Sequence, residues 1–317
     1  MAKDLKQILE NCVPYGIVKY CGKRLQAKRQ AKYTEEEKKM RERGERIRHH
    51  FLSLDPNKQE PETREIIEYF EKNNFSIFPY DFIQKYGSLK IKFFYDKTCG
   101  MHYVLHNGKR MYFPKNWTAK QGKSYYRALC MEQDENSPHR YETADFIPKN
   151  DDIIVDVGAA EGIWALTYAE VAKKIYLFEC DSGWEQALQK TFEPYKEKTI
   201  MVNKYVSDKS EGENITLDDY FDNETINFIK ADIEGYELKL LKGMAKILTR
   251  EKDLKLLLCA YHNKKDEEEL KNGLGKFGFY TECSKRYMLF AQDKNIEPPY
   301  VRRGLVRARK TSTLYDI

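Results

Sequence analysis

The second half of the chain alternates short apolar runs with amphipathic stretches. Five of the apolar runs have the length and composition of buried strands: residues 152–158, 174–180, 199–206, 226–232 and 254–262. Helical patterns lie between most of them. Residues 182–192 start with a capping box formed by Ser182 and Glu185, and residues 234–248 carry an apolar stripe. This alternation predicts an α/β fold, with a doubly wound parallel sheet covered by helices on both faces.

Two further apolar runs, residues 277–283 and 286–292, close this region. Only a few residues separate them, which is too few for the crossover that a parallel pair needs. We therefore expect a C-terminal antiparallel hairpin at one edge of the sheet.

The first half of the chain has a different pattern. A helix is expected near residues 62–72, and two β-rich runs flank Asn107-Gly108, a strong hairpin signal. A capped helix start is expected at Thr34. These patterns divide the chain into four regions: a basic helical region at 1–54, a mixed α+β accessory region with a β-hairpin at 55–147, the main sheet domain at 148–292, and a basic tail at 293–317.

Composition fits a chain with a sizeable core. Of the 317 residues 41% are hydrophobic, and no apolar run approaches the roughly 20 residues of a membrane span. The N-terminus lacks the apolar stretch of a signal peptide. The seven cysteines are scattered and form no CxxC pair, which is typical of reduced thiols. We expect a cytoplasmic protein, and the sequence leaves its oligomeric state open.

The net charge of +5 is unevenly distributed. Residues 1–50 hold 14 Lys and Arg against 7 Asp and Glu, and a second basic cluster occupies 302–310. Both regions suit phosphates, an anionic membrane surface or an acidic glycan. A solvated helix face explains the same charges equally well.

A glycine-rich turn, DVGAAEG at residues 156–162, follows the first strand and opens a helix, where a doubly wound sheet binds its cofactor. Ala160 stands where a dinucleotide fingerprint has its second glycine. The second strand ends in Glu179, in the usual place for an acid that binds ribose hydroxyls. This pattern favours S-adenosylmethionine over a nicotinamide cofactor. The alternative is that the glycines only allow tight turns.

Carboxylates gather at the end of the fourth strand, in IKADIEGYELKLLKG (229–243). If the chain crosses back after strand three, Asp232 and Glu234 lie beside the end of strand one, with His262 on the same rim. These three residues are the candidates for the base in methyl transfer, with His262 first because its ordinary pKa is near neutral. They could instead hold a divalent metal. Glu237 could simply complement the dipole of the next helix.

Four motifs resemble the FkbM family of S-adenosylmethionine-dependent methyltransferases: DVGAAEG, LFECD, ITLDDY and, above all, IKADIEGYELKLLKG. The resemblance covers about residues 138–292. It implies a class I (Rossmann-like) methyltransferase fold and transfer to a hydroxyl oxygen. The acceptor it implies is a sugar hydroxyl of a bacterial surface polysaccharide or its precursor, a glycan or glycolipid.

The resemblance also assigns residues to the cofactor. Asp156, Gly158, Glu161 and Gly162 go to its methionine part, and Ala160, in the same turn, is the mild departure from the family motif. Glu179 goes to the ribose. Val206, Ser207 and Asp208 follow strand three and go to the adenine side.

Several alternatives stay open. An RNA-directed methyltransferase could use the basic N-terminal region, although the sequence lacks an Asn/Asp-Pro-Pro-Tyr motif and a known RNA-binding module. A scaffold without activity and a nicotinamide oxidoreductase are further readings. His139 and Arg140 either cover the site or belong to a polar linker, and the hairpin aromatics either stack on sugars or form core. The basic N-terminal region could hold the enzyme at the inner membrane.

Overall fold

The computed structural model describes residues 23–290 and 297–310, without the side chains of 23–34 and 37. The chain forms two compact units, each assembled from three segments. The first unit contains residues 1–89, 124–138 and 286–302, and the second contains 90–123, 139–285 and 303–317. These divisions differ from the four regions predicted, because the accessory region contributes to both units.

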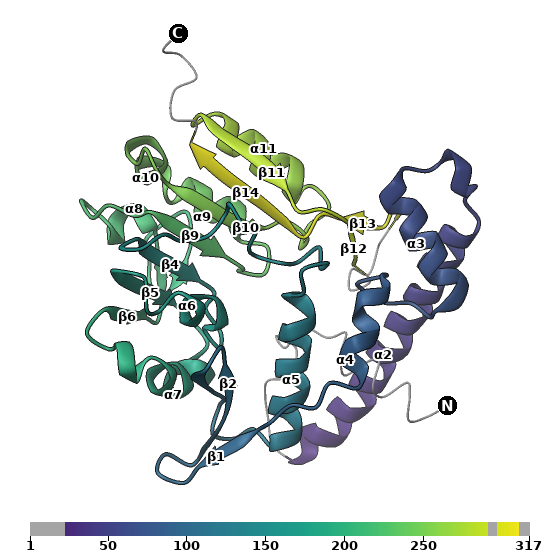
Figure 1. The fold of residues 1–317 in the computed structure, drawn as a ribbon, viewed down its shortest axis with the longest axis horizontal. Coiled ribbons are helices and arrows are strands. Elements are labelled where there is room, and N and C mark those ends of the chain that lie inside the picture. Colours follow the sequence, from purple (N-terminus) through teal and green to yellow (C-terminus); the bar gives the residue numbers. More distant parts are fainter. Residues whose placement is uncertain (1–22, 291–296, 311–317) are drawn as a thin grey trace. The chain divides into compact units, whose positions relative to one another are not determined.

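The first unit is mainly helical (Figure 1). It contains α2 (Lys23–Leu52), η2 (Pro56–Lys58), α3 (Pro61–Lys72), η3 (Asp81–Ile83), α4 (Gln84–Gly87) and the paired strands β12 (Met288–Leu289) and β13 (Val301–Arg302). Ile47 and Phe51 of α2 are buried, as are Ile66 and Phe70 of α3. Because α2 begins at Lys23, the helix start predicted at Thr34 is wrong.

The second unit begins with a small antiparallel sheet. Its strands are β1 (Phe94–Asp96), β2 (Met101–His106) and β3 (Lys109–Tyr112). Asn107 and Gly108 both have positive φ, as a two-residue hairpin turn requires, so the predicted hairpin is confirmed. Helix α5 (Ala119–Glu132) follows, and the boundary between the units falls within it.

The main sheet has seven strands in the order β11-β14-β10-β9-β4-β5-β6. They are β4 (Ile153–Val157), β5 (Lys174–Phe178), β6 (Thr199–Val202), β9 (Phe228–Ala231), β10 (Lys255–Cys259), β11 (Phe279–Cys283) and β14 (Leu305–Lys310). The five strands β10, β9, β4, β5 and β6 are parallel to one another, and β14 is antiparallel to β10. Strand β4 lies between β5 and β9, so the predicted doubly wound order is confirmed.

The sheet closes with an antiparallel pair, as predicted, but one of its strands differs. Strand β11 pairs with β14, which lies in the predicted basic tail, and not with residues 286–292, which contain β12. Leu305, Val306 and Ala308 of β14 are fully buried. The arginines between and beside them conceal this strand in the sequence.

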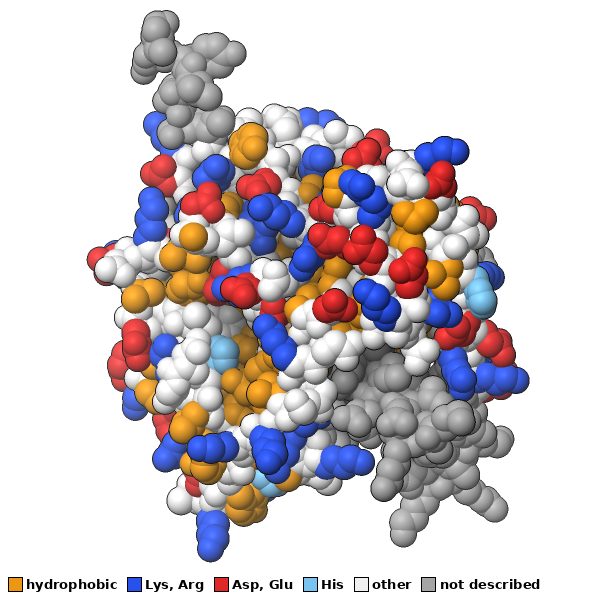
Figure 2. Space-filling view, turned by 45° about the vertical axis from the view of Figure 1, so that its right-hand side comes forward, with side chains coloured by type: hydrophobic (Ala, Val, Ile, Leu, Met, Phe, Trp, Pro, Cys, Tyr) orange, Lys and Arg blue, Asp and Glu red, His pale blue; other side chains and the backbone are white. Residues whose placement is uncertain are grey.

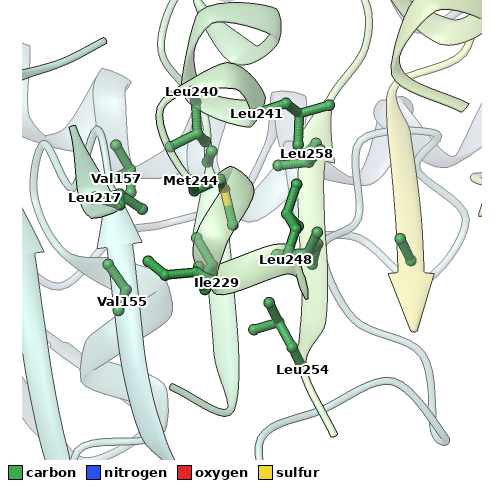
Figure 3. Packing of buried hydrophobic residues seen from close by; sticks show 14 of the residues in the cluster. Val155, Val157, Leu217, Ile229, Leu240, Leu241, Met244, Leu248, Leu254 and Leu258 are labelled. Atoms are coloured by element: carbon green, nitrogen blue, oxygen red, sulfur yellow. The ribbon is translucent and has the colours of Figure 1, made fainter. Parts of the chain in front are cut away.

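Helices α8 (Leu217–Tyr220), α9 (Glu237–Lys242), α10 (Ala245–Arg250) and α11 (Asp266–Gly275) bury their apolar side chains against one face of the sheet. In Figure 3, Val155, Ile229 and Leu258 of the strands meet Leu240 and Leu248 of the helices. On the other face, the Trp164 ring of α6 (Ile163–Thr167) packs 5.3 Å from that of Phe228.

Three local predictions need correction. Asp181, not Ser182, caps α7 (Ser182–Thr191), because its carboxylate accepts the Gly183 N–H at 2.8 Å. The third predicted strand divides into β6 and β7 (Tyr205–Val206), which pairs with β8 (Asn214–Ile215); η4 (Glu193–Tyr195) precedes β6. The helix predicted at 234–248 divides at Gly243.

Candidate active site

The turn after β4 is pressed against the end of β9. Gly158 has φ +73°, and a Cβ at this position would lie 2.0 Å from the Asp232 carbonyl oxygen. Only glycine fits there. Ala160 also has positive φ, and Gly162 packs against Phe192, so the whole turn has a specialised backbone.

Glu179 holds this turn to the start of α7. Its two carboxylate oxygens accept the N–H groups of Ala160 at 2.8 Å and Asp181 at 2.6 Å. Burial raises the pKa of Glu179. The structure thus brings Glu179 together with Ala160, and their assignment to the cofactor stays a prediction.

The other residues assigned to the cofactor surround the same turn or follow β6. Glu161 is buried within the turn. Val206 and Ser207 are buried and Asp208 is half-buried. The Ser207 carbonyl would lie 2.0 Å from a Cβ at Gly243, so the absence of a side chain at Gly243 makes room for this loop. A hydrogen bond between Tyr205 and Cys180 ties the loop to the end of β5.

Asp156 lies beneath the turn. It is in register with Lys230 on β9, and the Lys230 ammonium lies 2.9 Å from its carboxylate. Lys230 also donates to the Gly158 carbonyl at 3.0 Å. Burial opposes the charge of Lys230, but Asp156 and Asp232 outweigh it and raise its pKa. Sequence reasoning assigned Asp156 directly to the ligand, whereas its partner here is Lys230.

Asp232 is the centre of a polar cluster at the carboxyl end of β9. The hydroxyl of Tyr141 donates to one of its oxygens at 3.1 Å, and that of Tyr261 to the other at 3.5 Å. Burial favours a neutral carboxyl, but the charge of Lys230 and the two neighbouring histidines lower the pKa of Asp232 to about 2. Asp232 is therefore a carboxylate at neutral pH.

Three carboxylates surround His262. Its Nε2 lies 3.7 Å from Asp232 and 3.6 Å from Glu234, and its Nδ1 lies 3.4 Å from Glu237. Burial disfavours the imidazolium, but these acids raise the pKa of His262 to about 9. The side chain therefore carries its proton at neutral pH, so the reason for ranking it first as a base is wrong.

Glu234 and Glu237 have different environments. Glu234 has φ +55° and a side chain that is 71% exposed, so it stands at the rim. Glu237 is buried, and its carboxylate accepts the Ile233 N–H at 3.0 Å, just before α9. That contact agrees with the helix-start role considered for Glu237.

The segment before the main sheet also contributes to the cluster. His139 is buried, with its Nε2 3.9 Å from Asp232 and 3.8 Å from the Cys259 sulfur, and burial lowers its pKa to about 4. Arg307 of β14 donates to the Tyr141 carbonyl at 3.1 Å and so fixes this segment. Sequence reasoning considered His139 but missed Tyr141, Arg307 and the role of Lys230. The two-residue spacing of Lys230 and Asp232 was the available signal.

Two groups of these residues have ligand spacing for a metal ion. Asp232, Glu237 and His262 bring ligand atoms within 4.8 Å of one another, as do His139, Asp232 and Cys259. The first group has the oxygen and nitrogen donors that a divalent cation accepts. The possible divalent metal stays a prediction.

Comparison with known proteins points to methyltransferases. Residues 181–280 match the model of the Methyltransferase FkbM domain. They include Asp232 and His262, but neither the glycine turn nor the Tyr141 and His139 side chains that contact Asp232. The predicted resemblance is confirmed over these residues. No protein with a curated description matches the chain.

Solved structures with a similar arrangement share only a small part of their sequence with this chain. Methyltransferase FkbM from Methylobacillus flagellatus KT has 18% identity and a TM-score of 0.42; the alignment covers 60% of this chain and 54% of that one. An rRNA methylase from Streptococcus thermophilus has 18% identity, coverage of 52% and 89%, and a TM-score of 0.36. A Streptococcus mutans methyltransferase in complex with SAH has 16% identity and a TM-score of 0.38, and the alignment covers 52% of this chain and 91% of that one. The chain thus spans about half the length of the M. flagellatus protein.

Among the residues that the structure describes, none of the helices is long and apolar enough to cross a membrane.

Proposed function

We propose that this protein, whose residues 181–280 match the FkbM methyltransferase domain, transfers a methyl group to a sugar hydroxyl of a bacterial surface polysaccharide or its precursor. The match supports a methyltransferase that uses S-adenosylmethionine. That the methyl group goes to an oxygen atom is our proposal beyond this match. One observation carries it: Asp232, whose carboxylate is ionised and hydrogen-bonded, has its backbone carbonyl directly against the Gly158 turn.

Asp232 suits the orientation of a hydroxyl group. In the reaction, the acceptor oxygen forms a bond to the methyl carbon while the carbon–sulfur bond breaks, and S-adenosylhomocysteine leaves. A carboxylate that accepts a hydrogen bond from the hydroxyl aligns its oxygen and receives its proton as the new bond forms. The protonated His262 beside Asp232 stabilises the carboxylate, and the exposed Glu234 can pass the proton to solvent.

The cofactor assignment can be tested by calorimetric titration with S-adenosylhomocysteine, NAD and NADP in parallel. We expect micromolar binding of S-adenosylhomocysteine alone. Glu179→Gln should weaken it, because the variant loses a charged acceptor of the Ala160 and Asp181 N–H groups. A preference for a nicotinamide cofactor would refute the reading of the DVGAAEG turn.

The acceptor can be tested with isotopically labelled S-adenosylmethionine and a panel of oligosaccharides, glycolipid precursors and RNA transcripts. Mass spectrometry should find the label on a sugar oxygen. Asp232→Asn should lower transfer about 100-fold or more while S-adenosylhomocysteine binding persists. Asp145→Asn is the matched control, because Asp145 lies in the same unit and its side chain is 69% exposed.

Labelled RNA bases would support the alternative, an RNA-directed enzyme that uses its basic N-terminal region. The location we propose is the cytoplasm, with peripheral contact to an anionic inner membrane where lipid-linked glycans are assembled. The basic charge of residues 1–50 supports this contact.

A further inference from the structure

The segment that carries β1, β2 and β3 is strongly basic. Residues 90–123 hold eight Lys and Arg but a single acid, Asp96. Seven of the basic side chains are exposed: Lys90, Lys92, Lys97, Arg110, Lys115, Lys120 and Lys123. This charge belongs to neither of the two basic ends of the chain.

Asp96 does little to offset this charge outside its own segment. It accepts hydrogen bonds from the Thr98 N–H at 2.9 Å, the Thr98 hydroxyl at 2.6 Å and the Tyr112 hydroxyl at 2.9 Å, and it lies 3.8 Å from Arg110. These contacts, those of Thr98 first, hold its pKa below the usual range. The surface around it therefore presents positive charge to a ligand.

Apolar side chains lie among the charges. Phe94 is 38% exposed, Tyr95 55% and Leu105 50%. Figure 2 shows Lys and Arg side chains beside hydrophobic ones along the lower left of the visible face. Exposed aromatic and apolar groups next to lysines suit a polymer that has both charged groups and C–H surfaces.

The ring geometry distinguishes between two such polymers. Phe94, Tyr103 and Tyr112 are directly opposite one another across the three strands. The Phe94 and Tyr103 rings stack with centroids 5.2 Å apart, and the Arg110 guanidinium lies 4.9 Å over Tyr103. Tyr103 therefore has little free ring face for a nucleic-acid base, which needs such a face to stack. The exposed lysines with apolar side chains among them therefore favour a polyanion without bases, such as a saccharide with acidic groups.

The small sheet packs against α7, the helix that follows Glu179. The Tyr112 N–H donates to the Thr191 hydroxyl of α7 at 2.9 Å, and the Trp117 and Trp184 rings lie 5.2 Å apart. Helix α7 starts three residues after Glu179. We propose that the β1–β3 surface binds an anionic polysaccharide, one that bears carboxylate or phosphate groups, and so holds the acceptor near the transfer site. The identification of this polymer as the acceptor rests on the proposed function.

The test is binding of fluorescently labelled polygalacturonate to the full chain without S-adenosylmethionine. Lys92→Glu/Lys97→Glu/Lys115→Glu should weaken binding at least tenfold and flatten its salt dependence. The control is Lys242→Glu/Lys252→Glu/Lys276→Glu, three exposed lysines elsewhere in the same unit, which should bind as the unchanged protein does. Circular dichroism confirms that each variant is folded.

Neutral dextran and poly(U) complete the design. The proposal is supported if neither dextran nor equimolar poly(U) displaces much of the bound polygalacturonate. Equal loss of binding in the two triple variants, or tighter binding of poly(U) than of polygalacturonate, overturns it. Because no methyl transfer is measured, a failure here is separate from a failure of the proposed reaction.

Discussion

The buried pair of Asp156 and Lys230 supports the glycine turn at the scale of single residues. Both side chains are almost fully buried, and Lys230 also holds the Gly158 carbonyl. Lys230→Met leaves Asp156 as an unpaired buried charge, so we expect unfolding to need about 3–5 kcal/mol less. Urea unfolding followed by tryptophan fluorescence measures this, because all three tryptophans lie in the second unit.

A double variant separates the pair from its packing. Asp156→Asn/Lys230→Met removes both charges and should regain much of the loss. If the double variant is as unstable as the single one, then packing of the lysine stem, and not the charge pair, is what matters.

His262 should make stability depend on pH. Its pKa in the fold, about 9, lies above the ordinary value of 6.5, so the folded state binds the proton more tightly than the unfolded state. The resulting stabilisation, on the order of 3 kcal/mol, is complete below pH 6.5 and is lost as pH rises to about 9. NMR titration of the ring protons measures the pKa, and His262→Gln should flatten the stability profile over this interval. A measured pKa near 6.5 would restore His262 as the leading base.

At the scale of elements, the sequence predicted the glycine turn after β4, but not how closely Gly158 packs against the Asp232 carbonyl. Gly158→Ala should abolish S-adenosylhomocysteine binding and destabilise the second unit, because the new methyl group would meet the Asp232 carbonyl. Gly278→Ala is the control: its φ of +77° is similar, but nothing lies within 4 Å of the added Cβ. It should cost only about 1–2 kcal/mol. Equal effects in thermal unfolding would show that backbone strain alone explains Gly158.

Sequence patterns predicted the parallel strands because each run holds at most one charged residue in its interior, as β4 holds Asp156 and β9 holds Lys230. They failed for β14, where basic residues alternate with the apolar ones. In β14, Arg307 is buried because it holds the Tyr141 carbonyl, a contact with a segment more than 160 residues away. The same applies to the Asp232 cluster: its carboxylates stand in one motif, but Tyr141 and His139 reach it only through the fold.

The position of β14 leads to a prediction about truncation. A chain that ends at Arg303 loses the strand between β10 and β11, so we expect the second unit to unfold or aggregate. A chain that ends at Lys310 keeps β14 complete and should retain its thermal midpoint. Circular dichroism compares the two, and similar spectra would mean that the sheet does not need this strand.

At the scale of the whole molecule, the basic N-terminal region cannot be treated as a detachable tail. Ile47 and Phe51 of α2 belong to the core of the first unit, so deletion of residues 1–54 would damage that unit as well as remove charge. A loss of membrane binding in such a deletion would therefore prove little. Charge substitution on the exposed side of α2 is the better test.

We expect Lys38→Glu/Arg41→Glu/Arg46→Glu to weaken binding to phosphatidylglycerol vesicles in a sedimentation assay. All three side chains are exposed, and each basic residue near an anionic surface contributes about 1 kcal/mol. The variant of the β1–β3 surface, Lys92→Glu/Lys97→Glu/Lys115→Glu, has the same change in net charge, but on the second unit. If α2 faces the membrane, only the α2 variant loses vesicle binding, while only the variant of the β1–β3 surface loses polygalacturonate binding. Equal losses in both assays would mean that net charge, and not two separate surfaces, governs how this protein meets anionic partners.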